Sequence, residues 1–155
     1  KKREEELARI RAGQNRATTG NFAKMKGNLK WPVQGRITRK FGKERNPDTG
    51  VVIENVGVDI RATSGTPVQS VLDGVVSTVN YIRGHGNIII IDHGGGFSTV
   101  YAQIDNISVH ENEYIQMGNT IASVAIPGEN TKAILHFEVW GNQKKLNPEH
   151  WLIRR

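Results

Sequence analysis

The 155-residue sequence predicts an all-β domain made of short antiparallel strands. Eight runs rich in valine, isoleucine, threonine and aromatic residues follow one another, and glycines separate most of them. Almost none of this part has the 3.6-residue apolar repeat of an amphipathic helix. Strands that follow one another without intervening helices are typical of antiparallel sheets. The predicted strands lie at residues 33–41, 57–62, 66–71, 74–82, 87–93, 97–104, 120–126 and 135–140.

A leading segment of different composition precedes these strands. Residues 1–14 are rich in helix formers, but their apolar stripe is too thin and short for a stable isolated helix. We interpret them as the end of an upstream helix or coiled coil. The sequence up to residue 28 mixes Gly, Thr, Asn and Lys without apolar periodicity, as a linker or regulatory arm does. The predicted division is a segment 1–28 followed by a domain 29–155.

Charge and composition exclude several classes of function. Residues 1–30 hold 9 Lys and Arg against 3 Asp and Glu, whereas the other 125 residues hold 12 of each sign. The predicted domain is therefore electrically neutral, which argues against nucleic-acid binding. The absence of cysteine excludes disulfides, thiolate nucleophiles and cysteine-ligated metals. No apolar run approaches the roughly 18–20 residues that span a bilayer.

Two predicted strands and two predicted turns indicate how the sheet is organised. Residues 88–91 are four isoleucines, apolar on both faces, so this strand should be central and covered on each side. The strand at 97–104 mixes polar and apolar positions and suits a strand with one face in a groove. Residues 84–87 and 94–96 are rich in glycine, which tolerates the positive φ of tight hairpins.

Five separated segments resemble a known family in order and spacing. They are G-V-D-I at 57–60, G-T-P-V at 65–68, D-G-V-V at 73–76, Y-A-Q at 101–103, and L-H-F-E-V at 135–139 followed by N-P. This series resembles the lysostaphin-type, LytM-like zinc metallopeptidase domain of cell-wall enzymes. The resemblance covers about residues 31–152, and it implies an antiparallel sheet with a substrate groove.

The resemblance also implies a zinc site whose positions can be compared one by one. Catalytic members use a His, an Asp four residues later and the second His of a His-x-His strand as ligands, and two further histidines handle protons. Here Asn55 replaces the first ligand, whereas Asp59 is kept. Gln103 replaces the histidine after Tyr-Ala, and Ile134 replaces the first histidine of His-x-His. The second, His136, is kept.

These replacements predict loss of both zinc and catalysis. An amide oxygen is a poorer zinc ligand than an imidazole nitrogen, and the Gln103 amide does not accept a proton near neutral pH. General acid–base groups contribute roughly 10²–10⁴-fold each, so losing both proton-handling histidines removes useful hydrolysis. The remaining Asp59 and His136 form either a salt-bridged or hydrogen-bonded pair or a vestigial two-ligand site.

The other histidines have different expected roles. His93 lies where the family also carries a structural histidine at a strand end, so we expect it to stabilise a turn. His110 and His150 lie in polar segments and should be surface residues. His85 lies in a hairpin loop that lines the substrate groove in this family, which makes it a candidate contact residue.

A LytM-like domain without catalytic residues, following a helical segment, resembles the murein hydrolase activators of the EnvC and NlpD type. The resemblance implies a periplasmic or cell-envelope protein of cell division and daughter-cell separation. Its degenerate groove would bind an N-acetylmuramoyl-L-alanine amidase and relieve that enzyme's autoinhibition. A membrane division complex would act on the upstream coiled coil. The helical lead-in favours the EnvC type, because an NlpD-type lead-in should be long and low in complexity.

The expected partner-binding residues are those that should line the groove. They are Val56, Tyr81, His85, His136 and Trp140, above the degenerate positions Asn55, Asp59, Gln103 and Ile134. Strand alternation places residues 136, 138 and 140 on one face. Trp140 can equally be a core or lid residue, and Glu138 can receive a basic side chain from the partner.

Two other functions remain open from the sequence. The first is an unusual zinc-dependent peptidoglycan endopeptidase in which Asn55, Asp59 and His136 still hold a metal ion. The second is a passive peptidoglycan-binding scaffold, whose groove would hold glycan or stem peptide without any amidase.

Overall fold

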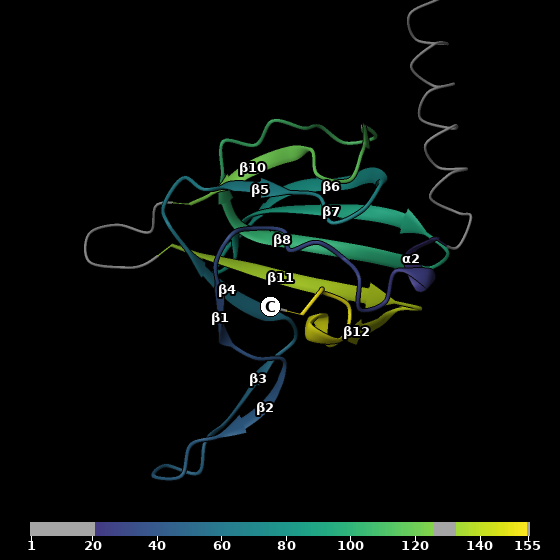
Figure 1. Ribbon diagram of the computed structural model, residues 1–155. Helices are drawn as coiled ribbons and strands as arrows, with labels where there is room; N and C mark the ends of the chain where they lie inside the picture. Colours follow the sequence, from purple (N-terminus) through teal and green to yellow (C-terminus); the bar gives the residue numbers. More distant parts are fainter. Residues whose placement is uncertain (1–20, 126–132, 155) are drawn as a thin grey trace, which may run out of the picture.

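The computed structural model describes residues 21–125 and 133–154, and these ranges fold around one large antiparallel sheet. Its main path is β1-β4-β11-β8-β7-β6-β9, with three short strands beside it, and a two-stranded ribbon stands apart (Figure 1). The strands are β1 (Arg36–Arg39), β2 (Gly42–Arg45), β3 (Val52–Asn55), β4 (Val58–Ala62), β5 (Pro67–Gln69), β6 (Gly74–Ile82), β7 (Gly86–Gly94), β8 (Phe97–Asp105), β9 (Tyr114–Ile115), β10 (Thr120–Val124), β11 (Ala133–Gly141) and β12 (Lys144–Leu146). The paired strands run antiparallel, as predicted.

The isoleucine strand β7 is central, with β6 on one side and β8 on the other. Ile89 and Ile91 are fully buried in the main core, which they share with Tyr101 and Phe137. On the other face Ile88 is buried but Ile90 is only partly buried. The prediction of a central strand is confirmed, and the cover over its second face is incomplete at Ile90.

The turns beside β7 are the predicted hairpins. Gly84 and Gly86 adopt φ of 90° and 74° between β6 and β7. Three glycines between β7 and β8 also have positive φ. Positive φ carries little steric cost in glycine, so these positions allow the chain to reverse tightly.

The ribbon of β2 and β3 was not among the predicted strands. It projects from the main sheet in Figure 1, and it exposes Val52 and Ile53 by 54% and 50%. Neither strand covers the core, so neither needs the alternation of apolar and polar residues that marks a half-buried strand in a sequence. The ribbon ends at Asn55, and the chain then passes directly into β4.

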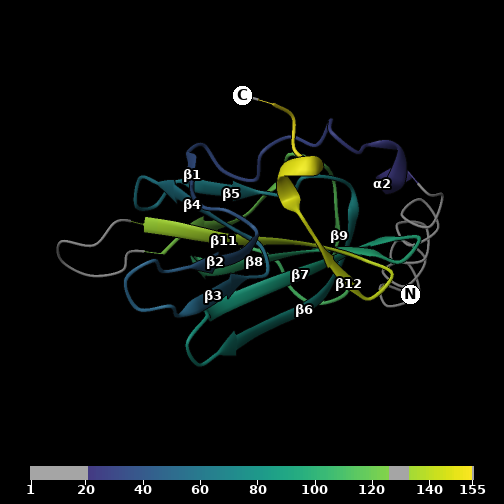
Figure 2. The same cartoon turned by 90° about the horizontal axis from the view of Figure 1, so that it is seen from below.

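The packed domain begins before the predicted boundary at residue 29. Helix α2 (Asn21–Lys24) places Phe22 in the core with none of its surface exposed. The Phe22 ring centroid lies 5.0 Å from that of Trp151, so α2 and the C-terminal segment cover the same side of the sheet (Figure 2). A single aromatic residue among Gly, Asn and Lys carries no periodic signal. The predicted helix or coiled-coil end at 1–14 lies outside the described residues.

Two further features complete the outline of the fold. The 3₁₀ helix η1 (Pro148–His150) follows β12, and the Asn147 side chain caps it by accepting a hydrogen bond from the Glu149 amide. Within the described ranges, no helix has the length and apolarity needed to cross a membrane.

His93 has the structural role that the sequence predicted. Its ring is buried, with Nδ1 2.7 Å from the Asp73 carbonyl oxygen and Nε2 2.8 Å from the Thr99 hydroxyl. Because a carbonyl only accepts, Nδ1 carries the proton, and the Thr99 hydroxyl donates to Nε2 in the neutral ring. Burial lowers the pKa of His93 from 6.5 to about 4. The strand end is therefore fastened to the preceding turn by an uncharged imidazole.

We predict that acid destabilises the protein through His93. Its unfolded form takes up a proton near pH 6.5 and its folded form only near pH 4, so stability falls as the pH drops between these values. The full loss is about 3 kcal/mol of unfolding free energy. Urea titrations should show this acid limb, and His93→Gln should flatten it. The control His150→Gln changes an exposed histidine and should leave the limb in place, and a His93 ring that titrates above pH 6 by NMR would contradict this prediction.

Candidate functional site

The sheet face that carries Asp59, His136, Glu138 and Trp140 is called the His136 face. On β11 the odd-numbered neighbours Leu135 to Val139 point into the core, so the even-numbered residues point the other way. The register places Asp59 of β4 directly beside His136. The predicted alternation of residues 136, 138 and 140 is confirmed.

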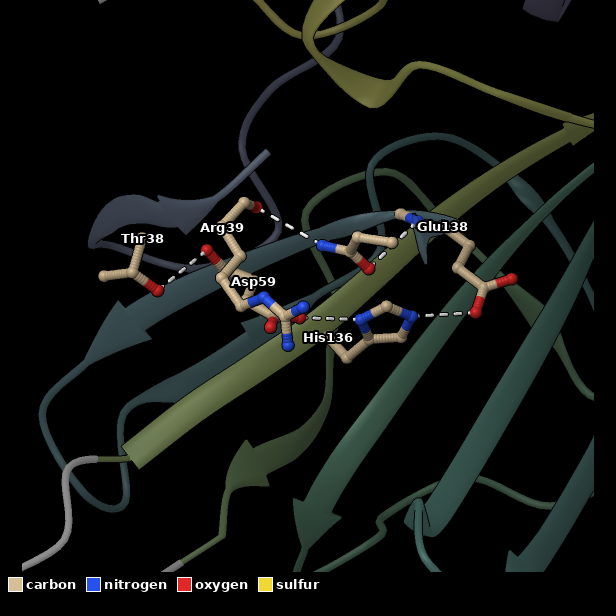
Figure 3. A network of polar contacts seen from close by, with 7 residues as sticks. Thr38, Arg39, Asp59, His136 and Glu138 are labelled. Carbon is tan, nitrogen blue, oxygen red and sulfur yellow. Dashed lines mark hydrogen bonds and ion pairs between the residues drawn. The ribbon is translucent and has the colours of Figure 1, made fainter. Parts of the chain in front are cut away.

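The imidazole of His136 is held between two carboxylates. Its Nδ1 lies 2.7 Å from Oδ1 of Asp59, and its Nε2 lies 2.8 Å from Oε2 of Glu138 (Figure 3). The side chains of all three residues are largely buried, with 11–14% exposed. Asp59 and His136 are therefore in direct contact as an ion pair.

The carboxylates make His136 a cation at neutral pH. Burial lowers its pKa, but hydrogen bonds to Asp59 and Glu138 and their negative charges raise it further, to about 9. A protonated imidazole has two N–H donors and no acceptor, so each ring nitrogen donates to one carboxylate. The cluster of one cation and two anions satisfies each of its buried polar atoms.

Glu138 is tied to Trp140 as well as to His136. The indole Nε1 donates to Oε1 of Glu138 at 2.7 Å, and the Nζ of Lys145 lies 5.0 Å from the centre of the Trp140 ring. Burial raises the pKa of Glu138, but its hydrogen bonds to His136 and Trp140 and the charge of Lys145 bring the net shift downward. The sequence interpretation of Glu138 as a partner contact missed this internal pairing, which strand alternation alone does not reveal.

Gly57 makes room for this arrangement. A Cβ at this position would overlap the carbonyl oxygen of Phe137 and lie 2.8 Å from Cγ of Glu138. The backbone entering β4 therefore passes against β11 at the point where Glu138 turns toward His136. This close approach needs a residue without a side chain.

Asn55, at the first of the replaced ligand positions, fastens the chain instead. Its side-chain nitrogen donates to the carbonyl oxygen of Arg39, and its side-chain oxygen accepts from the amide of Gly57, both at 3.4 Å. Figure 3 shows Arg39, whose carbonyl oxygen accepts the first of these bonds, beside the His136 cluster. Val56 follows and is partly buried. The Asn55 side-chain amide joins β1, the ribbon and the start of β4, and its hydrogen bonds within the described ranges do not go to Asp59 or His136.

Gln103 and His85 lie together at one end of β8. Gln103 is an exposed residue with φ of 63°, at a bulge in the pairing of β7 with β8. The backbone N–H of Gln103 donates to the backbone carbonyl oxygen of His85 at 3.2 Å, and the backbone carbonyl of Gln103 accepts from the N–H of Ala125. The structure thus joins two predicted site residues that lie far apart in sequence through their backbones.

Ile134 and Tyr81 lie in different places relative to His136. Ile134 is on the His136 face, beside Arg61 of β4. Tyr81 lies two residues after Val79 of β6 and therefore shares its face, and Val79 pairs with the core residue Ile89. Tyr81 thus belongs to the core side of the sheet, opposite to the His136 face. It is 67% exposed near the end of its strand. A partner contact for Tyr81 stays a prediction, and the strand register does not place it with His136.

The remaining histidines lie as the sequence predicted. His110 is exposed and its Nε2 lies 3.4 Å from Oε1 of Glu113, whereas His150 is exposed in η1. Neither approaches the His136 cluster through any hydrogen bond within the described ranges.

The fold and these five positions define a LytM-like domain, and comparison with known proteins gives its family. Residues 54–148 match Peptidase family M23, and the chain belongs to that family. It is similar to the murein hydrolase activators NlpD and EnvC of Escherichia coli, with 32% identity over 127 residues and 27% over 136. These matches cover 81% and 88% of this chain, but only 31% and 32% of the two relatives.

The solved structures that it resembles include peptidases. A zinc-containing peptidase from Vibrio cholerae matches with a TM-score of 0.70 and 31% identity, over 80% of this chain and 40% of that one. By comparison, the chain spans about a third of the length of the curated relatives NlpD and EnvC.

The site residues of this chain, as arranged, do not fit the zinc ion of the family. The two carboxylates bind opposite nitrogens of one imidazole ring, so the ring keeps them from converging on a common ion. Among residues 21–125 and 133–154, no group of three His, Cys, Asp or Glu could hold a metal ion.

We predict that the protein loses stability in alkali through His136. Its folded pKa of about 9 lies above the ordinary 6.5, so its contribution is complete below pH 6.5 and disappears as the pH rises through 9. The loss is on the order of 2–3 kcal/mol. Urea titrations at pH 6.5 and 9.5 measure it, and His136→Gln should remove most of the difference. An unchanged difference in that variant, with His110→Gln as control, would refute this assignment.

Proposed function

We propose that this domain is a non-catalytic activator of peptidoglycan amidases. The observation that supports this most directly is the His136 imidazole held between Asp59 and Glu138. The family normally binds zinc at this place in the fold. This chain has an internal ion cluster there. The chain's similarity to proteins named murein hydrolase activators supports regulation of peptidoglycan hydrolysis.

The positions that would handle protons support the absence of hydrolysis. Gln103 presents an amide and Ile134 an aliphatic chain, so neither can serve as a general base or acid near neutral pH. Asn55 is bonded to the backbone of Arg39 and Gly57, and the Asp59 and Glu138 carboxylates are both bonded to His136. We therefore propose that the site binds a partner rather than hydrolysing a substrate.

The partner in this proposal is an N-acetylmuramoyl-L-alanine amidase that docks on the His136 face. Trp140 is its aromatic anchor, because the ring is partly buried and fixed by Glu138 and Lys145 before any partner arrives. Pre-fixed aromatic side chains lose little entropy on binding and often dominate interfaces. His85 is exposed in the turn whose backbone bonds to Gln103, and in this proposal it extends the contact.

The setting of this activity belongs to the same proposal. Relatives named as activators of murein hydrolases, and one named an outer membrane lipoprotein, support a place in the periplasm or cell envelope during cell division. Control by a membrane division complex through an upstream coiled coil, and a regulatory arm within residues 1–28, remain proposals from the sequence.

We predict that the protein releases dye from labelled peptidoglycan only together with a cognate amidase. Trp140→Ala and His85→Ala should each reduce the stimulated rate, by about 10-fold or more for the tryptophan, as at interface anchors. Met117→Ala removes another exposed apolar side chain, near β9, and should leave the rate unchanged. Urea midpoints of all variants separate lost contact from lost folding.

The other outcomes of this assay identify the other functions. Chelator-sensitive release by the protein alone would show an enzyme and overturn the proposal. If dye is released neither by the protein alone nor by the protein with the amidase, the assay is repeated with a variant that lacks residues 1–20. This deletion removes the proposed blocking arm but keeps Phe22. Continued failure, with the protein sedimenting with sacculi at 0.5 M salt, would identify a passive scaffold, because salt at that level suppresses attraction by charge alone.

We also predict that the purified protein retains no stoichiometric zinc after dialysis. Elemental analysis should find well under one equivalent, and added chelator should leave the urea midpoint unchanged, because no bound metal stabilises the fold. Glu138→Gln weakens one of the two carboxylate contacts of His136 and tests whether the cluster excludes the metal. One equivalent of zinc in the wild type would contradict this prediction and favour the endopeptidase.

A further inference from the structure

Two arginines face each other on neighbouring strands with no carboxylate between them. Arg36 of β1 and Arg61 of β4 are direct cross-strand partners. Side chains in such pairs start about 5 Å apart, and like charges there destabilise a sheet. The next pair on the same face, Arg39 and Asp59, combines opposite charges. The arginine pair is therefore a stability cost that the neighbouring pair avoids.

Neither guanidinium is neutralised elsewhere. In the described parts of the chain, Arg36 and Arg61 take part in no ion pair and no side-chain hydrogen bond. Arg36 is exposed and Arg61 is partly buried, and both line one open hollow of about 610 Å³. The two positive charges therefore border the same space.

The hollow offers several hydrogen-bond donors. Its polar lining comes from Gln34, Thr63 and Ser64 together with the two arginines, and none of the lining residues that the structure describes is acidic. Hydroxyl, amide and guanidinium groups all donate to oxygen anions. The lining is therefore complementary to a carboxylate or another oxyanion.

Gly35 brings the two strands close enough for this arrangement. A Cβ at Gly35 would overlap the carbonyl oxygen of Arg61 and lie 3.0 Å from a methyl group of Ile60. Since the overlapping atom is backbone, no side-chain movement relieves the clash. The residue that precedes Arg36 thus lies directly against the strand of Arg61.

The arginine pair continues the His136 face. Arg36, Arg61 and Ile134 form one row across β1, β4 and β11, and Arg39, Asp59 and His136 form the next row. Figure 1 shows β1, β4 and β11 side by side at this end of the sheet. A ligand that covers the His136 face reaches the arginines without leaving the sheet.

We propose that Arg36 and Arg61 form an anion-recognition site for an acidic side chain of the protein partner that docks on the His136 face. This inference rests on the proposed function, which supplies the partner. The residues outside 1–30 hold equal numbers of basic and acidic side chains. Apolar Ile134 and aromatic Trp140 on the same face favour a protein segment with mixed apolar and acidic residues over polar glycan.

The first test measures the anion site without any partner. Sodium acetate, a carboxylate probe, is titrated against sodium chloride at constant ionic strength, and the arginine Nε–H resonances are followed by NMR. We expect saturable shifts of Arg36 and Arg61 that Arg61→Gln abolishes and Lys24→Gln, on α2, leaves intact. Shifts that never saturate, or that persist in Arg61→Gln, would overturn the anion site.

The second test measures the affinity for a cognate amidase. Arg36→Gln and Arg61→Gln should each raise the dissociation constant roughly 10-fold, as expected for charged hydrogen bonds, and the double variant should raise it further. Arg61→Lys keeps the charge and should restore part of the affinity. The urea midpoint should stay equal or rise in Arg61→Gln, because the substitution removes repulsion, whereas a purely structural arginine would lower it.

The outcomes separate this inference from the proposed function. A wild-type protein that binds no amidase refutes the proposed function, and this assignment of the carboxylate with it. Wild-type binding that Arg36→Gln and Arg61→Gln leave unchanged refutes only the arginine site. If the double variant loses sedimentation with sacculi and keeps the amidase, the carboxylate belongs to peptidoglycan and the protein-partner inference is overturned.

Discussion

The ion cluster of Asp59, His136 and Glu138 determines what this site can do. A protonated imidazole between two carboxylates compensates one buried cation with two buried anions, and the Trp140 indole satisfies a remaining carboxylate oxygen. Removing His136 would leave two carboxylates without their cation in a poorly solvated place, which costs several kcal/mol in typical cases. The cluster therefore holds β4 and β11 in register and keeps the ring nitrogens from other ligands.

The family's metal site and this cluster solve the same electrostatic problem in different ways. In our proposal, the cation that joins the side chains of neighbouring strands is the protonated His136 rather than a metal ion. A proton on a ring nitrogen cannot polarise water as zinc does, so it would stabilise the sheet without supporting hydrolysis. The proposal thus keeps the fold and uses its face for binding.

The two ends of the His136 face differ in their electrostatics. At Trp140 the charges are already compensated within the chain, by Glu138 and Lys145. At Arg36 and Arg61 they are not. Internally compensated groups rigidify a surface, whereas uncompensated like charges lower stability unless a ligand of opposite sign is present. In our proposal the first end provides shape and the second provides selectivity for an acidic partner.

The sequence by itself determined the sheet class, the central isoleucine strand and both glycine hairpins, because periodicity and turn chemistry are local properties. Motif spacing also predicts Asn55, Gln103 and Ile134 as replaced positions, which stays a prediction. Only the tertiary structure decided the rest. Glu138 reaches His136 because Gly57 lets β4 approach β11, and Arg36 meets Arg61 because Gly35 leaves room between their strands. Phe22 joins the core by packing against the rings of His93 and Trp151, which lie far from it in the sequence. Such contacts depend on pairing between strands far apart in the chain, which no local pattern encodes.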